Sequence, residues 1–158
     1  MCTVSFISCS KEGPTGPKGN TGTAKVIYSD WKYAEHDNRD TIIVATNQNL
    51  FNLLAPEITK HRLDSAVTLL VYLTWGSDIH HLPYTSYAGG SGNTIDYFTR
   101  VGEIILSRFT FDNSNTVKLS NILQYSYVII PGGVAGGTKS LLSYGHYRAV
   151  CIKYGIPE

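Results

Sequence analysis

The chain has 158 residues, of which 42% are hydrophobic and 11% aromatic, and its formal net charge is +1. A chain of this length suits one domain with one buried core. The small net charge, without a long basic run, argues against an electrostatic nucleic-acid binder, which carries a clustered basic face. Charged residues make up only 16% whereas tyrosine occurs 11 times, and this composition favours a β-rich extracytoplasmic protein.

The amino terminus carries a motif typical of lipid attachment. Phe6-Ile7-Ser8-Cys9 resembles the end of a bacterial lipoprotein signal peptide, in which a large apolar residue, a tolerated residue and a small residue precede cysteine. Processing would make Cys9 the first mature residue and place acyl chains on its thiol and amine. The alternative is an accidental cysteine in a tail, but the polar and glycine-rich residues that follow favour lipidation.

The segment before Cys9 has only eight residues, whereas a signal peptide needs a basic start and an apolar stretch of about 7–15 residues. We therefore interpret residues 1–9 as the remnant of a lipoprotein signal peptide, with Met1 an internal or misassigned start or the segment truncated. No stretch reaches the roughly 20 apolar residues that span a bilayer, so we expect anchorage by lipid alone.

Residues 10–24 form a collagen-like tract. Glycine stands at positions 13, 16, 19 and 22, and proline at positions 14 and 17. So few Gly-X-Y triplets give little interchain bonding, which favours a semi-rigid, polyproline-like spacer. The alternative is a trimer nucleated by the tract. The composition changes abruptly at Lys25, and we assign residues 25–158 to one β-sandwich domain.

The domain shows the alternation of apolar and polar residues that is typical of strands. We expect single strands at residues 25–32, 41–46, 67–75, 80–87 and 125–130. The β-branched run at residues 41–46 predicts a buried strand, and residues 117–123 are a weaker strand candidate. Residues 94–111 predict two strands around Gly102, or one long bent strand with a bulge there.

Two helices complete the prediction. Residues 56–65 predict a short helix with proline at its first position, and its inward side would contain Ile58, Leu63 and Ala66. Residues 144–154 predict a helix capped by Ser143 and ended by a left-handed glycine at position 155. Its apolar stripe would bury Cys151 as a small hydrophobe. Together these elements predict an antiparallel β-sandwich of about seven or eight strands with one short internal helix and a C-terminal helix.

Five landmarks along residues 9–158 resemble those of the collagen-like lipoproteins of Bacteroidota. They are Cys9-Ser10-Lys11-Glu12-Gly13, the Gly-X-Y triplets, Val26-Ile27-Tyr28-Ser29-Asp30-Trp31, Tyr127-Val128-Ile129-Ile130-Pro131-Gly132-Gly133 and Tyr154-Gly155-Ile156-Pro157-Glu158. The resemblance implies a surface or periplasmic lipoprotein with a small β-rich domain and no assigned chemistry.

Metal-binding and catalytic motifs are weak in this sequence. His80 and His81 follow Asp78, but adjacent strand residues point to opposite faces and do not easily share one ion. The polar residues 35–40 lack the spacing and glycine of a calcium loop, so a turn is the better interpretation. There is no GxSxG motif, and the glycine-rich residues 131–137 lack the lysine ending of a phosphate loop. We expect no metal, no cofactor and no enzymatic activity.

Trp75, Tyr84 and Tyr87 lie near predicted loops and are the candidates for an aromatic platform that contacts a sugar ring. The alternative is inward packing or pairing across strands, which is common for aromatic residues in sheets. We therefore expect a lipid-anchored protein of the bacterial cell envelope (outer membrane, periplasmic or surface-exposed) with a binding or structural role. Its expected partners are the membrane and a glycan or another envelope protein. The competing hypothesis is an envelope enzyme that acts on glycan, with catalytic residues that the sequence does not identify.

Overall fold

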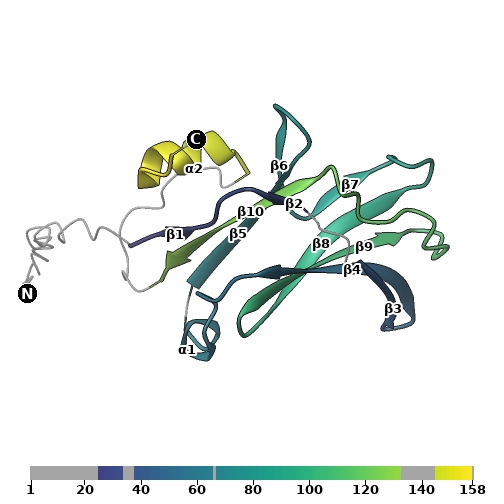
Figure 1. Cartoon of the computed structure of the whole chain (residues 1–158), viewed down its shortest axis with the longest axis horizontal. Helices are drawn as coiled ribbons and strands as arrows, with labels where there is room; N and C mark the ends of the chain where they lie inside the picture. Colours follow the sequence, from purple (N-terminus) through teal and green to yellow (C-terminus); the bar gives the residue numbers. More distant parts are fainter. Residues whose placement is uncertain (1–24, 34–37, 66, 133–144, 158) are drawn as a thin grey trace, which may run out of the picture.

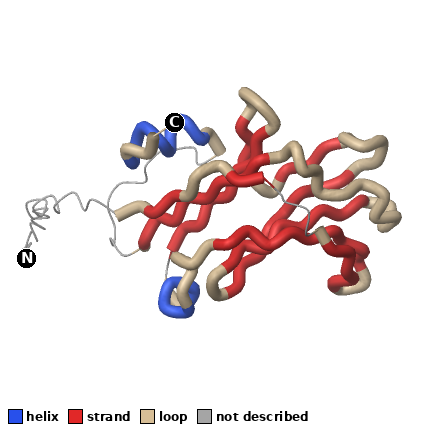
Figure 2. Tube along the Cα trace, viewed as in Figure 1, coloured by secondary structure: helices blue, strands red, loops and turns tan. Residues whose placement is uncertain are grey.

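The computed structural model describes residues 25–33, 38–65, 67–132 and 145–157. Two antiparallel sheets lie face to face in this part of the chain (Figures 1 and 2), and a helix near the carboxyl end covers the outer face of one of them. The architecture confirms the predicted antiparallel β-sandwich with a short internal helix and a C-terminal helix.

The first sheet has the strand order β1-β10-β5-β6, and β2 also pairs with β10. Its strands are β1 (Ile27–Tyr28), β2 (Lys32–Tyr33), β5 (Val67–Thr74), β6 (Ile79–His81) and β10 (Gln124–Pro131). The central pair, β5 and β10, is aligned along its whole length, from Val67 opposite Pro131 to Thr74 opposite Gln124. The second sheet has the order β3-β4-β9-β8-β7. Its strands are β3 (Arg39–Ile43), β4 (Thr46–Leu54), β7 (Tyr84–Ser86), β8 (Asn93–Arg100) and β9 (Glu103–Thr110).

The strands β5 and β10 read as almost continuous apolar runs because both of their faces are covered. Alternate side chains such as Val71 and Tyr125 join the core between the sheets. Their neighbours, including Tyr72 and Val128, pack instead beneath helix α2 (Tyr147–Tyr154). Cys151 is buried in this second cluster, as predicted.

The prediction of a buried strand at residues 41–46 is wrong. The segment is a hairpin in which Ile43 pairs with Thr46, and Val44 and Ala45 form its turn with φ of 47° and 60°. Positive φ at both central residues is typical of a type I′ hairpin turn, whose twist matches that of the flanking strands. Two large apolar side chains of this segment lie in solvent, since Ile42 is 69% and Val44 94% exposed, and none is fully buried.

Two predicted strands are each divided in the structure. Residues 25–32 form β1 and then continue to β2 after a break, where the Ser29 hydroxyl accepts a hydrogen bond from the Tyr127 amide at 3.0 Å. Residues 80–87 form β6 and β7, which belong to different sheets, and the chain crosses between the sheets at the cis peptide bond Leu82–Pro83. Residues 117–123 contain no strand but contribute buried side chains to the core.

Of the other local predictions, one turn is confirmed and both helices are shorter than predicted. Gly102, with φ of 82°, lies in the turn between β8 and β9, so the two-strand alternative for residues 94–111 is correct. The helix predicted at residues 56–65 is only α1 (Lys60–Leu63), because the chain turns before Thr59, which accepts a bond from the Arg62 amide as the N-cap. The helix α2 ends at a left-handed Gly155, as expected, but it begins at Tyr147, later than predicted, and its N-cap is His146 in place of the predicted Ser143. Residues 143 and 144 lie outside the described part. None of the described helices is long and apolar enough to cross a bilayer.

Candidate functional site

The predicted lipidation residue, Cys9, and the spacer at residues 10–24 lie outside the described residues. The same holds for His36 and Asp37 of the polar cluster between the first strands and for most of the glycine-rich segment after Pro131. The candidate contact residues Trp75, Tyr84 and Tyr87 are all described.

Trp75 and Tyr84 belong to one aromatic cluster with His80, in which each ring lies close to the other two. The rings of Trp75 and His80 are stacked, with centroids 4.6 Å apart and planes 17° apart. His80 lies 4.6 Å from the Tyr84 ring, and the Trp75 and Tyr84 centroids are 5.5 Å apart. Trp75 nevertheless remains 41% exposed, so this cluster fixes an indole ring that also faces solvent.

Three elements hold this cluster in place. Trp75 directly follows β5, where the buried Thr74 hydroxyl lies 3.1 Å from the Gly76 carbonyl oxygen and 2.8 Å from that of Asp78, and so braces the turn. His80 is in β6, and Tyr84 begins β7 and packs against the core between the sheets. The cluster therefore closes the edge of the sandwich at which the chain passes from one sheet to the other.

Tyr87 does not join the other two predicted residues. It is 80% exposed, and no ring contact connects it to the cluster among the described residues. It lies instead beside Gly92, where a Cβ atom would approach the rings of Phe111 and Tyr87 to 2.9 and 3.5 Å. The three-residue platform is thus reduced to two of its members plus His80, a residue that the sequence suggested only as a weak metal candidate.

His80 and His81 face opposite sides of β6, as the alternation of strand side chains predicts. The ring of His81 lies 5.4 Å from that of Tyr72, on the side of the sheet that α2 covers. Burial lowers the pKa of His81 because the charged imidazolium would lose hydration there. No group of three or more His, Cys, Asp or Glu side chains in the described residues is arranged to hold a metal ion.

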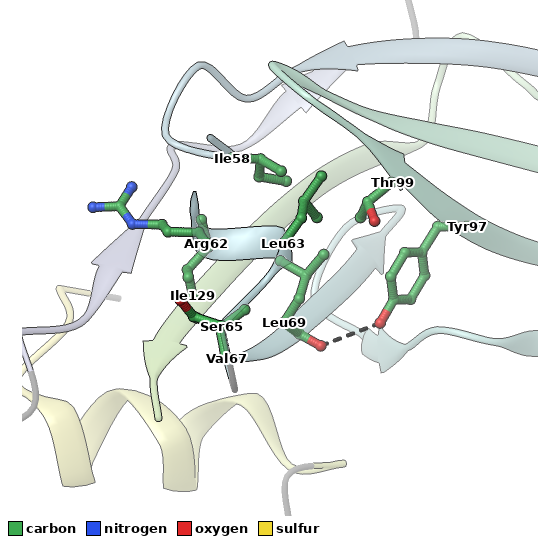
Figure 3. Close-up of a pocket in the computed structure, with 9 residues that line it drawn as sticks. All are labelled: Ile58, Arg62, Leu63, Ser65, Val67, Leu69, Tyr97, Thr99 and Ile129. Atoms are coloured by element: carbon green, nitrogen blue, oxygen red, sulfur yellow. Dashed lines mark hydrogen bonds between the residues drawn. The ribbon is translucent and has the colours of Figure 1, made fainter. Parts of the chain in front are cut away.

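A second feature is a cavity of about 330 Å³ between α1 and the two sheets (Figure 3). Five aliphatic side chains line the cavity: Ile58, Leu63, Val67, Leu69 and Ile129. Tyr97, Thr99, Ser65 and Arg62 complete the lining. The Tyr97 hydroxyl donates a hydrogen bond of 3.1 Å to the Leu69 carbonyl oxygen across the cavity wall. The walls therefore come from α1, β5, β8 and β10.

The cavity lies where both sheets have short outer strands. β6 pairs only with residues 72–74 of β5, and β7 pairs only with residues 93–95 of β8. The neighbouring parts of β5 and β8 therefore pair with β10 and β9 on one side but have no strand on their outer side in the described residues. Two backbone groups in these parts are hydrogen-bonded to side chains instead. The Tyr97 amide donates to the Asp96 carboxylate at 2.7 Å, and the Leu69 carbonyl oxygen accepts from the Tyr97 hydroxyl.

The rim of the cavity is basic. The Arg62 guanidinium donates to the backbone carbonyl of Glu57. The carboxylate of Glu57 accepts a hydrogen bond of 2.7 Å from the Tyr127 hydroxyl, and this bond is the largest cause that lowers the pKa of Glu57. An adjoining hollow of about 400 Å³ shares Arg62, Ser65 and Val67 with the cavity and adds Lys25 and His61. No acidic residue is among the described residues that line the cavity or the hollow.

Arg108 is the most deeply buried basic residue described, but its contacts are structural. It is 5% exposed, and its guanidinium donates to Asn93 Oδ1 at 2.9 Å and to the carbonyl oxygens of Lys118 and Ala88 at 2.8 and 3.3 Å. These bonds attach the loops on either side of β8 and β9 to the second sheet.

Comparison with known proteins adds no family assignment. No protein-family model, curated protein or solved structure matches this chain.

Proposed function

We propose that this protein is a non-enzymatic binding module of the bacterial cell envelope, held by an acylated Cys9 and presented on the spacer at residues 10–24. In this proposal Trp75, with His80 and Tyr84 behind it, contacts a glycan. The observation that carries the proposal is the stacked pair of Trp75 and His80, which holds an indole that is still 41% exposed.

Two physical arguments support a glycan contact at this cluster. The ring orientation is fixed by neighbouring rings and by strands, so little side-chain freedom is lost when a ligand binds. An indole also combines a large apolar face with an N–H donor, which suits a ligand that has both apolar C–H faces and hydroxyl groups. An isolated exposed tyrosine such as Tyr87 lacks the first advantage.

The anchor is supported by the residues around Cys9 and by their order before the Gly-X-Y tract. Stable membrane anchorage needs more than one acyl chain, and lipoprotein processing supplies chains on both the thiol and the amine of the cysteine.

Ligand binding is tested with an array of bacterial surface glycans, followed by titration of the best-bound oligosaccharide. Trp75→Ala should weaken binding at least about tenfold, which corresponds to about 1.4 kcal/mol. Tyr87→Ala is the matched control, because it removes an exposed ring outside the cluster, and it should leave affinity within about twofold. Equal effects of the two variants would refute the aromatic contact, and hydrolysis of the oligosaccharide would favour the enzyme hypothesis.

Anchorage is tested by mass spectrometry of the protein purified from membranes of its host. The wild-type protein and Cys151→Ser should carry acyl chains at Cys9, whereas Cys9→Ser should carry none and leave the membrane fraction. Cys151 serves as the control because it is a cysteine buried in the fold. A Cys9 thiol that is unmodified in the host would remove the anchor from the proposal.

A further inference from the structure

We propose that the cavity beneath α1 binds the hydrocarbon chain of a medium-length fatty acid, with the carboxylate at Arg62. This site is distinct from the aromatic cluster and does not depend on a glycan ligand. It lies at the other end of β5 from Trp75, because Val67 and Leu69 line it whereas Trp75 follows Thr74.

The size and lining of the cavity suit a small apolar ligand. Its volume of about 330 Å³ is at the lower end of the range of about 300–1,000 Å³ for small-molecule sites. Figure 3 shows the side chains of Leu63, Leu69, Tyr97 and Thr99 together on the side of the site opposite the Arg62 guanidinium. Each methylene that leaves water for such a site should strengthen binding about fourfold.

The charges around the cavity favour an anionic head group. The Arg62 stem lines the wall while its guanidinium points away from Leu63 and Tyr97 (Figure 3), which leaves the charge at the rim. One bond to the Glu57 carbonyl orients the guanidinium but uses only one of its five N–H donors. Lys25 and His61 line the adjoining hollow. The Glu57 carboxylate interacts electrostatically with Arg62, which is one of the charges that lower the pKa of Glu57, but its described hydrogen bond is accepted from the Tyr127 hydroxyl.

The same place is poorly suited to an added peptide strand, although both sheet edges are uncovered there. Strand addition needs a row of free backbone groups along an edge. Here the Tyr97 amide is bonded to Asp96, and the Leu69 carbonyl is bonded to the Tyr97 hydroxyl. A ligand that fills the space between the two edges needs no free backbone groups, so it fits this place better than a peptide that would extend one edge.

The test is calorimetric titration of the full chain with decanoate and with decanol, both below their aggregation limits. Decanoate should bind saturably and decanol more weakly. Arg62→Gln should weaken decanoate binding about tenfold while decanol changes less than about twofold. Lys60→Gln is the matched control, because Lys60 is a basic residue of the same helix that pairs with Asp64 and does not line the cavity. It should leave both affinities unchanged.

Filling the cavity tests the position of the chain. Thr99→Phe should abolish binding of both compounds while the circular dichroism spectrum remains that of the wild type. If Thr99→Phe does not fold, Thr99→Leu makes a smaller change at the same place and should weaken both compounds in parallel. The proposal is wrong if decanoate shows no saturable binding, if the folded cavity-filling variants bind it normally, or if Arg62→Gln and Lys60→Gln behave alike. Each of these results leaves the glycan test unaffected.

Discussion

The Tyr97 hydroxyl in β8 donates a hydrogen bond to the Leu69 carbonyl oxygen in β5 at 3.1 Å, so one side chain joins the edges of the two sheets. Tyr97→Phe should destabilise the protein by about 1–2 kcal/mol, because a partly buried carbonyl loses its partner. Tyr87→Phe, at an exposed ring, should stay within about 0.5 kcal/mol of the wild type. Urea denaturation followed by tryptophan fluorescence measures both; equal stability of the two variants would show that the bond contributes nothing.

Arg108 provides a second stability prediction. Arg108→Met should cost about 3 kcal/mol, because the variant leaves Asn93 Oδ1 and the Lys118 carbonyl without their charged donor. Arg100→Met, at an exposed position at the end of β8, should cost less than about 0.5 kcal/mol. Hydrogen exchange should also accelerate in the loop around Lys118 in the first variant alone. Unchanged exchange in that loop would contradict the anchoring role.

Gly89 and Gly90 form a matched pair, since both have φ of +87°. A Cβ on Gly89 would lie 2.7 Å from Val117 Cγ1, whereas a Cβ on Gly90 would meet nothing within 4 Å. Gly90→Ala should therefore cost about 1 kcal/mol from backbone strain alone. Gly89→Ala should cost about 1–3 kcal/mol more because Val117 is buried and stiff. Thermal denaturation of the two variants compares them, and equal losses would exclude the Val117 contact.

The Tyr127–Glu57 bond predicts a pH dependence. The bond lowers the pKa of Glu57 below its ordinary value of 4.5, so the unfolded chain binds this proton more readily than the folded chain. The stabilisation is complete above pH 4.5 and is lost as the pH falls through the lower pKa of the folded protein. The melting temperature of Tyr127→Phe should thus lie below that of the wild type at pH 7, and the difference should shrink under acid conditions. In a Glu57→Gln background the same substitution should have an effect that does not vary with pH.

The parts of the fold that local chemistry determines could be predicted from the sequence. The apolar runs of β5 and β10, the turn at Gly102 and the left-handed Gly155 each carry their own signal. The strand β4 was missed because its asparagines have low strand propensity. The Asn49 side chain can be buried because its carboxamide donates a hydrogen bond to Asp40 and accepts one from the Leu119 backbone amide. Leu119 is 70 residues away in the sequence, so this partner cannot be predicted locally.

The candidate sites could be predicted only in part, because they too depend on contacts between residues that are far apart in the sequence. The sequence places Trp75 and Tyr84 near predicted loops, but the stacking of His80 on Trp75 depends on the turn after β5 and on the pairing of β6 with β5. The cavity could not be predicted at all. Its lining combines Ile58, Leu69, Thr99 and Ile129, which come from four separate segments and have no common pattern in the sequence.

The antiparallel alignment of β1, β5 and β10 places the start of β1 and Trp75 at opposite ends of the first sheet. Ile27 lies opposite Ile129, near the end where Val67 meets Pro131, whereas Trp75 follows Thr74 at the far end. A strand of eight residues extends about 25 Å. In the proposed anchored state, attachment through the residues before Lys25 would place Trp75 at the end of the domain far from the bilayer and the cavity beside Arg62 at the near end.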